Sequence, residues 1–328
     1  MQQFDYIRAV DLGDALQALG GGAKLLAGGT TLYDLMKLRI ERPEQIVDIN
    51  HLSELSYFDT SGDRELVFGA LARMSDVAAD PRLVRDYPAI SESLWRAASQ
   101  QLRNMASLGG NLLQRTRCPY FRGGEPYACN KRHPDSGCAA IEGLDRGQAL
   151  LGASGACSAV YPGDLAAALV AFDAEVDVVG SQGARSIPVE ELHREPGDTP
   201  HIETTLAPDE IIVRIRVPAT PLGRGSTYLK VRDRESYAFA LASAAVALVM
   251  DGEVVRDARI ALGGLATRPW RVRAAERLLI GRRFDEDAAR AAGEAALEGA
   301  TPGRFNGFRI ELGVRTVVDA LTIARQRA

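Results

Sequence analysis

The four cysteines are the residues of this 328-residue chain best suited to chemistry, because all of them fall between positions 118 and 157. Their gaps of ten, eight and eighteen residues include no CxxC pair. The spacing therefore matches neither the closely spaced cysteine pairs of structural zinc sites nor the common cysteine motifs of ferredoxins. A single shared ligand site explains their clustering best. At this point an iron–sulfur cluster, a zinc site, and disulfides or free thiols all stay open for Cys118, Cys129, Cys138 and Cys157.

Basic residues surround these cysteines. An all-thiolate [4Fe–4S] site is anionic, so nearby cations would stabilise it and raise its potential. An ordinary solvated face, or a docking surface, is the alternative interpretation. The residues concerned are Arg115, Arg117, Arg122, Lys131, Arg132 and Arg146.

Two glycine pairs form the second candidate site. Gly28-Gly29 follows a short apolar run, and Gly109-Gly110 follows a helical stretch and precedes Asn111. Glycines let the backbone approach a ligand closely, and the free amides of a first helical turn attract anions. Neither pair is a GxGxxG fingerprint, so a Rossmann site is not indicated. Two such turns could grip one diphosphate from both sides, or be independent tight turns.

Hydrophobic periodicity predicts a mixed α and β chain around these sites. We expect helices at 12–19, from 31, at 91–103 and at 164–172, and strands at 24–26, 45–49, 66–70, 175–179 and 210–217. A break at 218–223 marks the best domain boundary. Beyond it we expect a three-stranded antiparallel sheet with a small helical cluster.

Composition limits the function classes. The net charge of −4 includes no dominant basic patch, which argues against a nucleic-acid partner. The sequence contains no stretch of about 18 apolar residues, so we expect no membrane span. The N-terminus lacks a basic region followed by an apolar one, so we expect no export signal in this chain.

Four motifs occur in the order seen in the FAD-binding subunit of the xanthine dehydrogenase family of molybdenum hydroxylases, and the chain resembles that subunit over its whole length. They are the segments 26–32 (LAGGTTL), 106–112 (ASLGGNL), 161–164 (YPGD) and 228–232 (YLKVR). The cysteine segment is similar to the flavoprotein subunit of bacterial PaoABC-type aldehyde oxidoreductases, in which an inserted loop holds a [4Fe–4S] cluster.

The resemblance implies an α+β fold. Its first part would be a PCMH-type (vanillyl-alcohol-oxidase-like) FAD-binding domain of two α/β subdomains, at 1–60 and 61–220, with the cluster loop inserted at 115–160. A C-terminal domain like that of the CO dehydrogenase flavoprotein would occupy 221–328.

The resemblance also implies roles for individual residues. The first turn would bind the FAD pyrophosphate, and the second turn would hold it from the other side. Asp164 would bond the cofactor or cap the following helix, Ile212 would pack on the flavin, and Lys230 would lie near the flavin ring. The implied FAD-binding set is Leu26, Ala27, Gly28, Gly29, Thr30, Thr31, Leu32, Tyr33, Asp34, Ser107, Gly110, Asn111, Asp164, Ile212 and Lys230. The implied cluster ligands are Cys118, Cys129, Cys138 and Cys157.

By the same resemblance, the chain would be an electron-transfer subunit of a heterotrimeric aldehyde oxidoreductase. A large subunit would hold the molybdopterin cofactor and carry out the aldehyde chemistry, and a small subunit would hold two [2Fe–2S] centres. This chain would pass electrons through its FAD to an external acceptor, which would be a protein, a quinone or oxygen rather than NAD. No residue here would act as a catalytic acid or base. The alternatives are a flavin-fold subunit whose cysteine loop binds zinc for docking, and a free-standing flavin oxidase.

The resemblance implies assembly in the cytoplasm. Export to the periplasm would then depend on a signal carried by a partner subunit, so the final compartment stays open.

Overall fold

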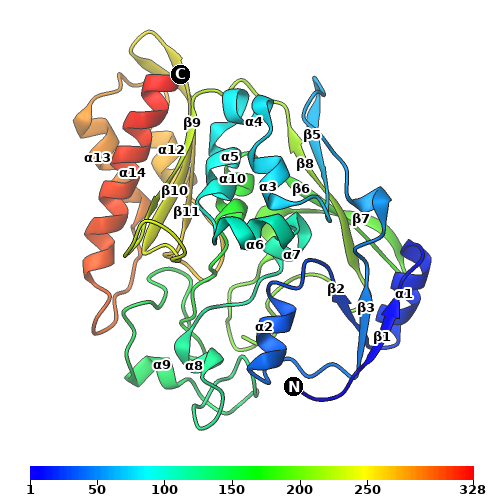
Figure 1. Ribbon diagram of the computed structural model, residues 1–328. Helices are drawn as coiled ribbons and strands as arrows, with labels where there is room; N and C mark the ends of the chain where they lie inside the picture. Colours follow the sequence, from blue (N-terminus) through cyan, green and yellow to red (C-terminus); the bar gives the residue numbers. More distant parts are fainter.

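The computed structural model describes residues 1–328, and its N-terminal part is a small parallel sheet (Figure 1). Strand β3 (Gln45–Asp48) lies between β1 (Asp5–Arg8) and β2 (Lys24–Leu26) and pairs in parallel with both. Parallel strands need crossover connections, and helices α1 (Leu12–Gly20) and α2 (Leu32–Lys37) lie within them. The chain therefore enters α2 directly from the edge strand β2 through the first glycine turn.

A five-stranded antiparallel sheet follows, in the order β4-β5-β8-β6-β7. Its strands are β4 (Phe58–Asp59), β5 (Glu65–Gly69), β6 (Glu175–Gly180), β7 (Gly183–Pro188) and β8 (Ile211–Pro218). The α-helices of this part are α3 (Met74–Ala78), α4 (Pro81–Asp86), α5 (Pro88–Trp95), α6 (Gln100–Met105), α7 (Leu108–Leu112), α10 (Leu165–Ala171) and α11 (Val189–Leu192). A short 3₁₀ turn at Ser53–Leu55 precedes the sheet. Because β8 pairs with β5, the sheet joins segments that are far apart in the sequence.

The C-terminal part is a four-stranded antiparallel sheet in the order β12-β11-β10-β9, covered by helices (Figure 1). Its strands are β9 (Ser226–Val231), β10 (Ala242–Asp251), β11 (Val254–Gly263) and β12 (Trp270–Arg271). Its helices are α12 (Arg273–Leu279), α13 (Glu286–Ala296) and α14 (Phe308–Arg327). Helix α14 packs against β9 and β10, and α13 packs beside it. No helix of the structure has the length and apolar character needed to cross a lipid bilayer.

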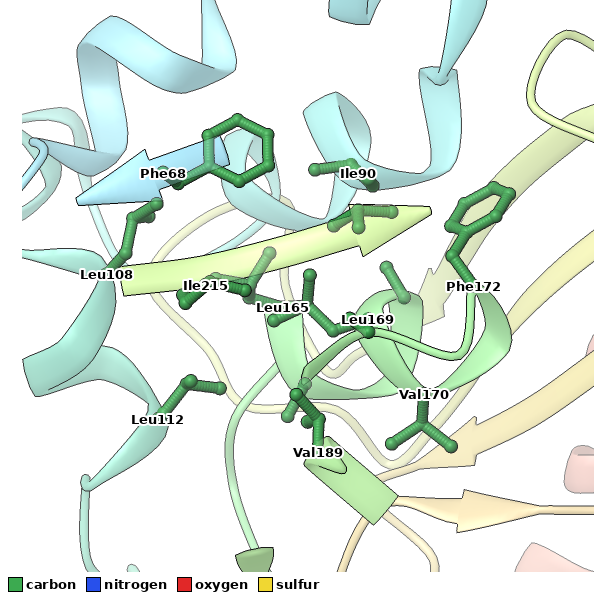
Figure 2. Packing of buried hydrophobic residues seen from close by; sticks show 14 of the residues in the cluster. Phe68, Ile90, Leu108, Leu112, Leu165, Leu169, Val170, Phe172, Val189 and Ile215 are labelled. Carbon is green, nitrogen blue, oxygen red and sulfur yellow. The ribbon is translucent and has the colours of Figure 1, made fainter. Parts of the chain in front are cut away.

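Helix α10 lies at the centre of the largest hydrophobic core (Figure 2). All of its residues are buried, as expected for a helix that is apolar on every side. Phe68 and Ile215 of the sheet contribute to the same core, together with Leu108 and Leu112 of α7. This packing anchors α7, and α7 carries the second glycine turn.

The cysteines lie in a long segment between α7 and α10 that has little regular structure. Its helices are the single turns α8 (Pro119–Arg122) and α9 (Ala139–Glu142), at the bottom of Figure 1. We call residues 113–160 the cysteine loop. Interactions outside regular secondary structure must therefore hold most of this loop in place.

The structure corrects three expectations from the sequence. The helix predicted at 91–103 is broken into α5 and α6, because Ala98 takes a φ of +46° and Ser99 caps α6 by accepting from the amide of Leu102. The C-terminal sheet has four strands rather than three, since the short β12 pairs with β11. Strand β1 was not predicted, and every one of its residues is exposed, so it lacks the alternating burial that reveals a strand.

Candidate cofactor site

The first glycine turn joins β2 to α2 and contacts the segment that leads to the second turn. Gly29 has a φ of +74°, a conformation that residues with a side chain rarely adopt. A Cβ atom on Gly28 would stand only 1.9 Å from the carbonyl oxygen of Met105, at the end of α6. The two glycines therefore have different roles. Gly29 permits the turn, and Gly28 permits two chain segments to touch.

The second glycine turn is fixed to the middle sheet. Ser107 lies at the N-cap of α7, and its Oγ accepts a hydrogen bond from the amide of Gly110 at 3.3 Å. The amide of Gly109 donates to the carbonyl oxygen of Ala70 at 2.8 Å, just beyond β5. A Cβ atom on Gly109 would stand 3.0 Å from the Cβ of Ala70. Backbone hydrogen bonds and close packing thus set the position of this turn.

Both turns line one cleft of about 530 Å³, a volume in the usual range of cofactor and ligand sites. The structure brings three separate segments together there, namely the first turn, the second turn and β8. The predicted FAD-binding residues that line the cleft are Ala27, Gly28, Gly29, Thr30, Thr31, Leu32, Ser107, Gly110 and Ile212.

The remaining predicted residues lie outside the cleft lining, and their part in cofactor binding stays a prediction. They are Leu26, Tyr33, Asp34, Asn111, Asp164 and Lys230. Asn111 lies between lining residues of α7, and its Oδ1 is buried without a hydrogen-bond partner. Tyr33 is largely exposed on α2.

Asp34 uses its carboxylate to hold the cysteine loop. Arg122 donates to both of its oxygens, at 2.7 and 3.1 Å, and Arg117 donates to Oδ2 at 3.2 Å. The hydrogen bond from Arg122 is the largest influence on Asp34 and lowers the pKa of its carboxyl group. This residue therefore links α2, directly after the first glycine turn, to the loop that carries the cysteines.

Asp164 and Lys230 form a buried pair with each other. Lys230 donates from Nζ to Oδ2 of Asp164 at 2.8 Å, and the Tyr228 hydroxyl donates to Oδ1 at 2.5 Å. Burial raises the pKa of Asp164 and lowers the pKa of Lys230, and the opposite charge of each partner counters that shift. Asp164 occupies the N-cap position of α10, but its side chain does not cap the helix. The pair instead joins α10 to β9, across two parts of the chain.

A second ion-pair network lies in the wall of the cleft. Arg115 donates to Glu41 at 2.7 Å and to Glu203 at 2.6 Å, and Lys131 lies 3.4 Å from Glu203. All four side chains line the cleft. The pairing balances the charges of these four side chains. Arg194, which also lines the cleft, takes part in no ion pair.

The pairing also corrects the expected cationic rim around the cysteines. Of the six basic residues, all except Arg132 pair with a carboxylate. The rim is thus partly neutralised, since Asp34 and Glu203 each pair with two of these cations, and several of its members serve as anchors of the loop. Sequence distance hid these pairs, since their partners lie on separate segments.

The two ends of the cysteine loop form part of the cleft wall. Arg115 and Thr116 line the cleft shortly before Cys118, and Ala159 and Val160 line it shortly after Cys157. The Thr116 hydroxyl donates to the carbonyl of Val160 at 2.9 Å, which closes the base of the loop. These flanking residues were not predicted as part of the cleft. Their positions next to the cysteines in the sequence could have suggested them.

Inside the loop, local contacts gather the cysteines. Cys129 and Cys138 lie opposite each other in an antiparallel bridge. Asn130 donates from Nδ2 to the carbonyl of Ala156 at 3.0 Å, which draws the segment of Cys157 toward the bridge. Cys118 and Cys129 also share one small apolar cluster, with Leu35 and Phe121 among its other members.

None of the cysteines forms a disulfide, and no group of three or more His, Cys, Asp or Glu side chains is placed to hold a metal ion. The structure therefore does not assemble the predicted four-cysteine metal site. Burial raises the pKa of Cys118 and raises that of Cys157 to about 11, so both thiols stay protonated and pack as small apolar groups. Each sulfur still accepts a weak hydrogen bond, from Gln148 Nε2 at 3.5 Å and from the Ala159 amide at 3.4 Å.

Tyr161 and His193 complete one end of the cleft lining. Their rings lie 4.2 Å apart between centroids, and both contact the carbonyl oxygen of Leu112. Sequence reasoning missed His193 because the segment between β7 and β8 contains no motif that would single it out.

The cleft and the fold agree with what comparisons with known proteins show. The family described as the FAD binding domain in molybdopterin dehydrogenase matches residues 2–220, and the CO dehydrogenase flavoprotein C-terminal domain matches residues 227–323. The chain therefore belongs to the FAD-binding flavoproteins of the molybdopterin dehydrogenases, which are oxidoreductases.

Two individual proteins are similar to this chain over most of its length. The chain is 46% identical to the aldehyde oxidoreductase FAD-binding subunit PaoB of Escherichia coli (strain K12), over 94% of this chain and 93% of that protein. It is 28% identical to the carbon monoxide dehydrogenase medium chain of Hydrogenophaga pseudoflava, over 90% of this chain and 86% of that one.

Solved structures confirm the predicted fold class. A structure of the H. pseudoflava carbon monoxide dehydrogenase, in a form lacking the Mo-pyranopterin moiety of its cofactor, matches with a TM-score of 0.77 at 28% identity. The match covers 100% of this chain and 99% of that chain.

Proposed function

We propose that this chain is the FAD- and [4Fe–4S]-carrying subunit of a heterotrimeric molybdenum-dependent aldehyde oxidoreductase. In this proposal a large molybdopterin-binding subunit oxidises the aldehyde, and a small subunit with two [2Fe–2S] centres delivers the electrons. This chain passes them on to an external acceptor. The similarity to the E. coli aldehyde oxidoreductase subunit supports the substrate class.

The observation that carries the proposal is that the cysteine loop and the cleft share a wall. Both ends of the loop line the cleft, and Leu35 of α2 lines the cleft while it also packs with Cys129 and Phe121. A redox centre held by the cysteines would therefore be separated from a cofactor in the cleft by little more than one layer of side chains.

The residues of the cleft fit FAD. In this proposal the first turn, from Gly28 to Thr30, holds the diphosphate through its backbone amides. The second turn contributes the Ser107 hydroxyl, because the amides of Gly109 and Gly110 already donate within the protein. Ile212 offers an apolar contact for the ring system. FAD supplies the capacity to take up and release electrons, and the protein supplies binding and orientation.

The cysteine loop supports a cluster more than a single ion. Four iron atoms with their sulfides are wider than one zinc ion, so their ligands must stand further apart. The four cysteines lie far apart in the sequence and include no CxxC pair of the kind that structural zinc sites use. Ligation would replace the thiol protons, since thiolates are the ligands. The ligands in this proposal are Cys118, Cys129, Cys138 and Cys157.

We further propose that the three sheets define the domain organisation. The parallel sheet belongs to an N-terminal subdomain at 1–60, and the middle sheet belongs to a second FAD-binding subdomain at 61–220. The last sheet and its helices form the C-terminal domain at 221–328. The strand order of each sheet supports this division, with one exception: the short β4 (Phe58–Asp59) belongs to the middle sheet although it lies before position 61.

Metal analysis of the anaerobically purified full chain tests the proposal. We expect flavin absorbance, a broad band near 400 nm, and about four iron and four sulfide per chain. One zinc per chain with flavin and no iron would contradict the cluster and favour a docking loop. Aldehyde oxidation by the chain alone would instead favour a free-standing flavin enzyme, and co-purification with molybdenum and [2Fe–2S] subunits would support the heterotrimer.

A further inference from the structure

Asn50 lies shortly after β3 and binds the first glycine turn. Its Nδ2 donates to the carbonyl oxygen of Ala27 at 2.8 Å, and Ala27 immediately precedes Gly28. The same Nδ2 donates to Oδ1 of Asp48 at 2.8 Å. A carbonyl oxygen and a carboxylate can only accept, so these two partners fix the orientation of the Asn50 amide group. The side-chain oxygen of Asn50 is therefore left to accept from another donor.

Arg73 supplies that donor and is itself paired with the second glycine turn. Its Nη2 donates to Oδ1 of Asn50 at 3.0 Å, and its Nη1 donates to the carbonyl oxygen of Met105. The backbone of Arg73 pairs with that of Ser107 in an antiparallel bridge. Backbone hydrogen bonds of 3.0 and 3.1 Å on either side of Arg73 form this bridge. The planar guanidinium group can reach both acceptors at once, because it presents several donors in a fixed fork.

These contacts connect the two turns through only two side chains. Asn50 binds the first turn, Arg73 is paired with Ser107 of the second turn, and the two side chains bond each other. The Met105 carbonyl oxygen, which Arg73 binds, is also the atom that a Cβ on Gly28 would meet first. Directional hydrogen bonds therefore set the spacing of the turns together with packing. Asn50 and Arg73 lie outside the cleft lining, so their effect on a bound group must act through the turns.

We propose that Asn50 and Arg73 are positioning residues that hold the two glycine turns at the spacing that the FAD diphosphate requires. The inference rests on the proposed function, since it takes FAD as the occupant of the cleft. A ligand that contacts both turns binds more tightly when their spacing is fixed in advance, because ordering them on binding would lower the affinity. Loss of either side chain should therefore weaken FAD binding without removing any group that touches the cofactor.

Substitutions in the flavin-free full chain test this role by fluorescence titration with FAD. Arg73→Met removes both donations and keeps most of the side-chain length, and Asn50→Ala removes the bond to the first turn. Each should bind FAD about tenfold more weakly, the effect of one hydrogen bond to a charged group. The double variant should bind no more weakly than the weaker single variant, because both side chains act through one connection. Arg73→Lys keeps a cationic donor and should bind FAD more tightly than Arg73→Met.

Arg273→Met is the matched control, because it breaks a two-bond contact with Glu190 outside the cleft lining and should keep wild-type FAD affinity. Circular dichroism shows which variants are folded, and Asn50→Ala keeps the test available if Arg73→Met does not fold, since it leaves Arg73 bound to Met105.

Wild-type FAD affinity in the folded Asn50 and Arg73 variants would overturn the inference. An equal loss in Arg273→Met, or equal losses in Arg73→Lys and Arg73→Met, would overturn it as well. So would a double variant whose loss is the product of the two single losses, because that result indicates two independent structural effects. A wild-type chain that takes up no FAD would instead contradict the proposed function itself.

Discussion

The glycine-lined cleft and the cysteine loop lie side by side but are built in opposite ways. The turns of the cleft join regular elements, and backbone hydrogen bonds and core packing of α7 fix the second turn. The loop has only two single-turn helices, and ion pairs such as Asp34 with Arg122 connect it to the rest. The first region is formed by the fold alone, whereas the second depends on side-chain anchors and, in our proposal, on its ligand.

This difference predicts different responses to substitution. A single substitution in a glycine turn of the cleft should change the backbone geometry and abolish cofactor binding. A single substitution in an ion pair that anchors the loop should lower the free energy of unfolding only slightly, because partly exposed ion pairs contribute little individually.

The largest effect is expected from Gly28→Ala. Its new Cβ would stand 1.9 Å from the Met105 carbonyl, so the two turns must move apart. We expect the purified chain to lose its FAD, as measured by flavin absorbance and by titration of the apoprotein. Gly20→Ala is the matched control, because a Cβ at Gly20 would meet no atom within 4 Å. Normal FAD content in Gly28→Ala would show that the contact between the turns is dispensable.

The second largest effect is expected from the buried pair of Asp164 and Lys230, which joins α10 to β9. In Lys230→Met the carboxylate of Asp164 stays buried without its cation, and we expect the free energy of unfolding to fall by about 3–5 kcal/mol in denaturant titrations. The double variant Asp164→Leu with Lys230→Met should recover much of that loss. Arg315→Met, which breaks an exposed pair with Glu311, serves as the control and should change stability by less than about 1 kcal/mol. A loss of similar size in the control would contradict the importance of burial.

His193 predicts the pH dependence of stability. Its folded pKa of about 4 lies below the ordinary value of 6.5, so the unfolded chain binds more protons between these values. Stability is then full above pH 6.5 and falls as the pH drops toward 4, by up to about 3 kcal/mol from this residue. Denaturant titrations of the wild type and His193→Gln should show a shallower fall in the variant. Parallel pH profiles would contradict the assignment.

The smallest effect is expected from Asp34→Asn. It weakens the anchor to Arg117 and Arg122 and should lower the free energy of unfolding by about 1 kcal/mol or less, because the side chains are partly exposed. Limited proteolysis should cut the cysteine loop faster than in the control Glu294→Gln, whose exposed pair lies on α13. Since Asp34 lies outside the cleft lining, FAD affinity should stay within about twofold. A large loss of FAD affinity would support the direct cofactor role that the sequence predicts.

The sequence was informative where function depends on one residue type at one place. Gly29 needs a positive φ, and a glycine pair between a strand and a helix reveals that need directly. Clustering of the cysteines likewise marked the loop. The sequence could not show that Gly28 contacts Met105, because that approach depends on how the tertiary fold places the end of α6 beside the turn after β2.

Long-range side-chain pairs were hidden for the same reason. The motif around Lys230 gave no sign that Asp164, 66 positions away in the chain, binds its ammonium group. Arg115 and Glu203 are 88 positions apart and meet only because the loop returns to the cleft. Such partners depend on tertiary packing, which neither periodicity nor motif spacing encodes.

The most direct test of the central claim is a crystal structure of the anaerobically purified chain with FAD bound. Our account predicts density for the diphosphate between the turn at Gly28–Thr30 and the turn at Ser107–Gly110, with the cysteine loop beside it. Flavin density elsewhere on the chain, or a chain that takes up no FAD, would contradict it.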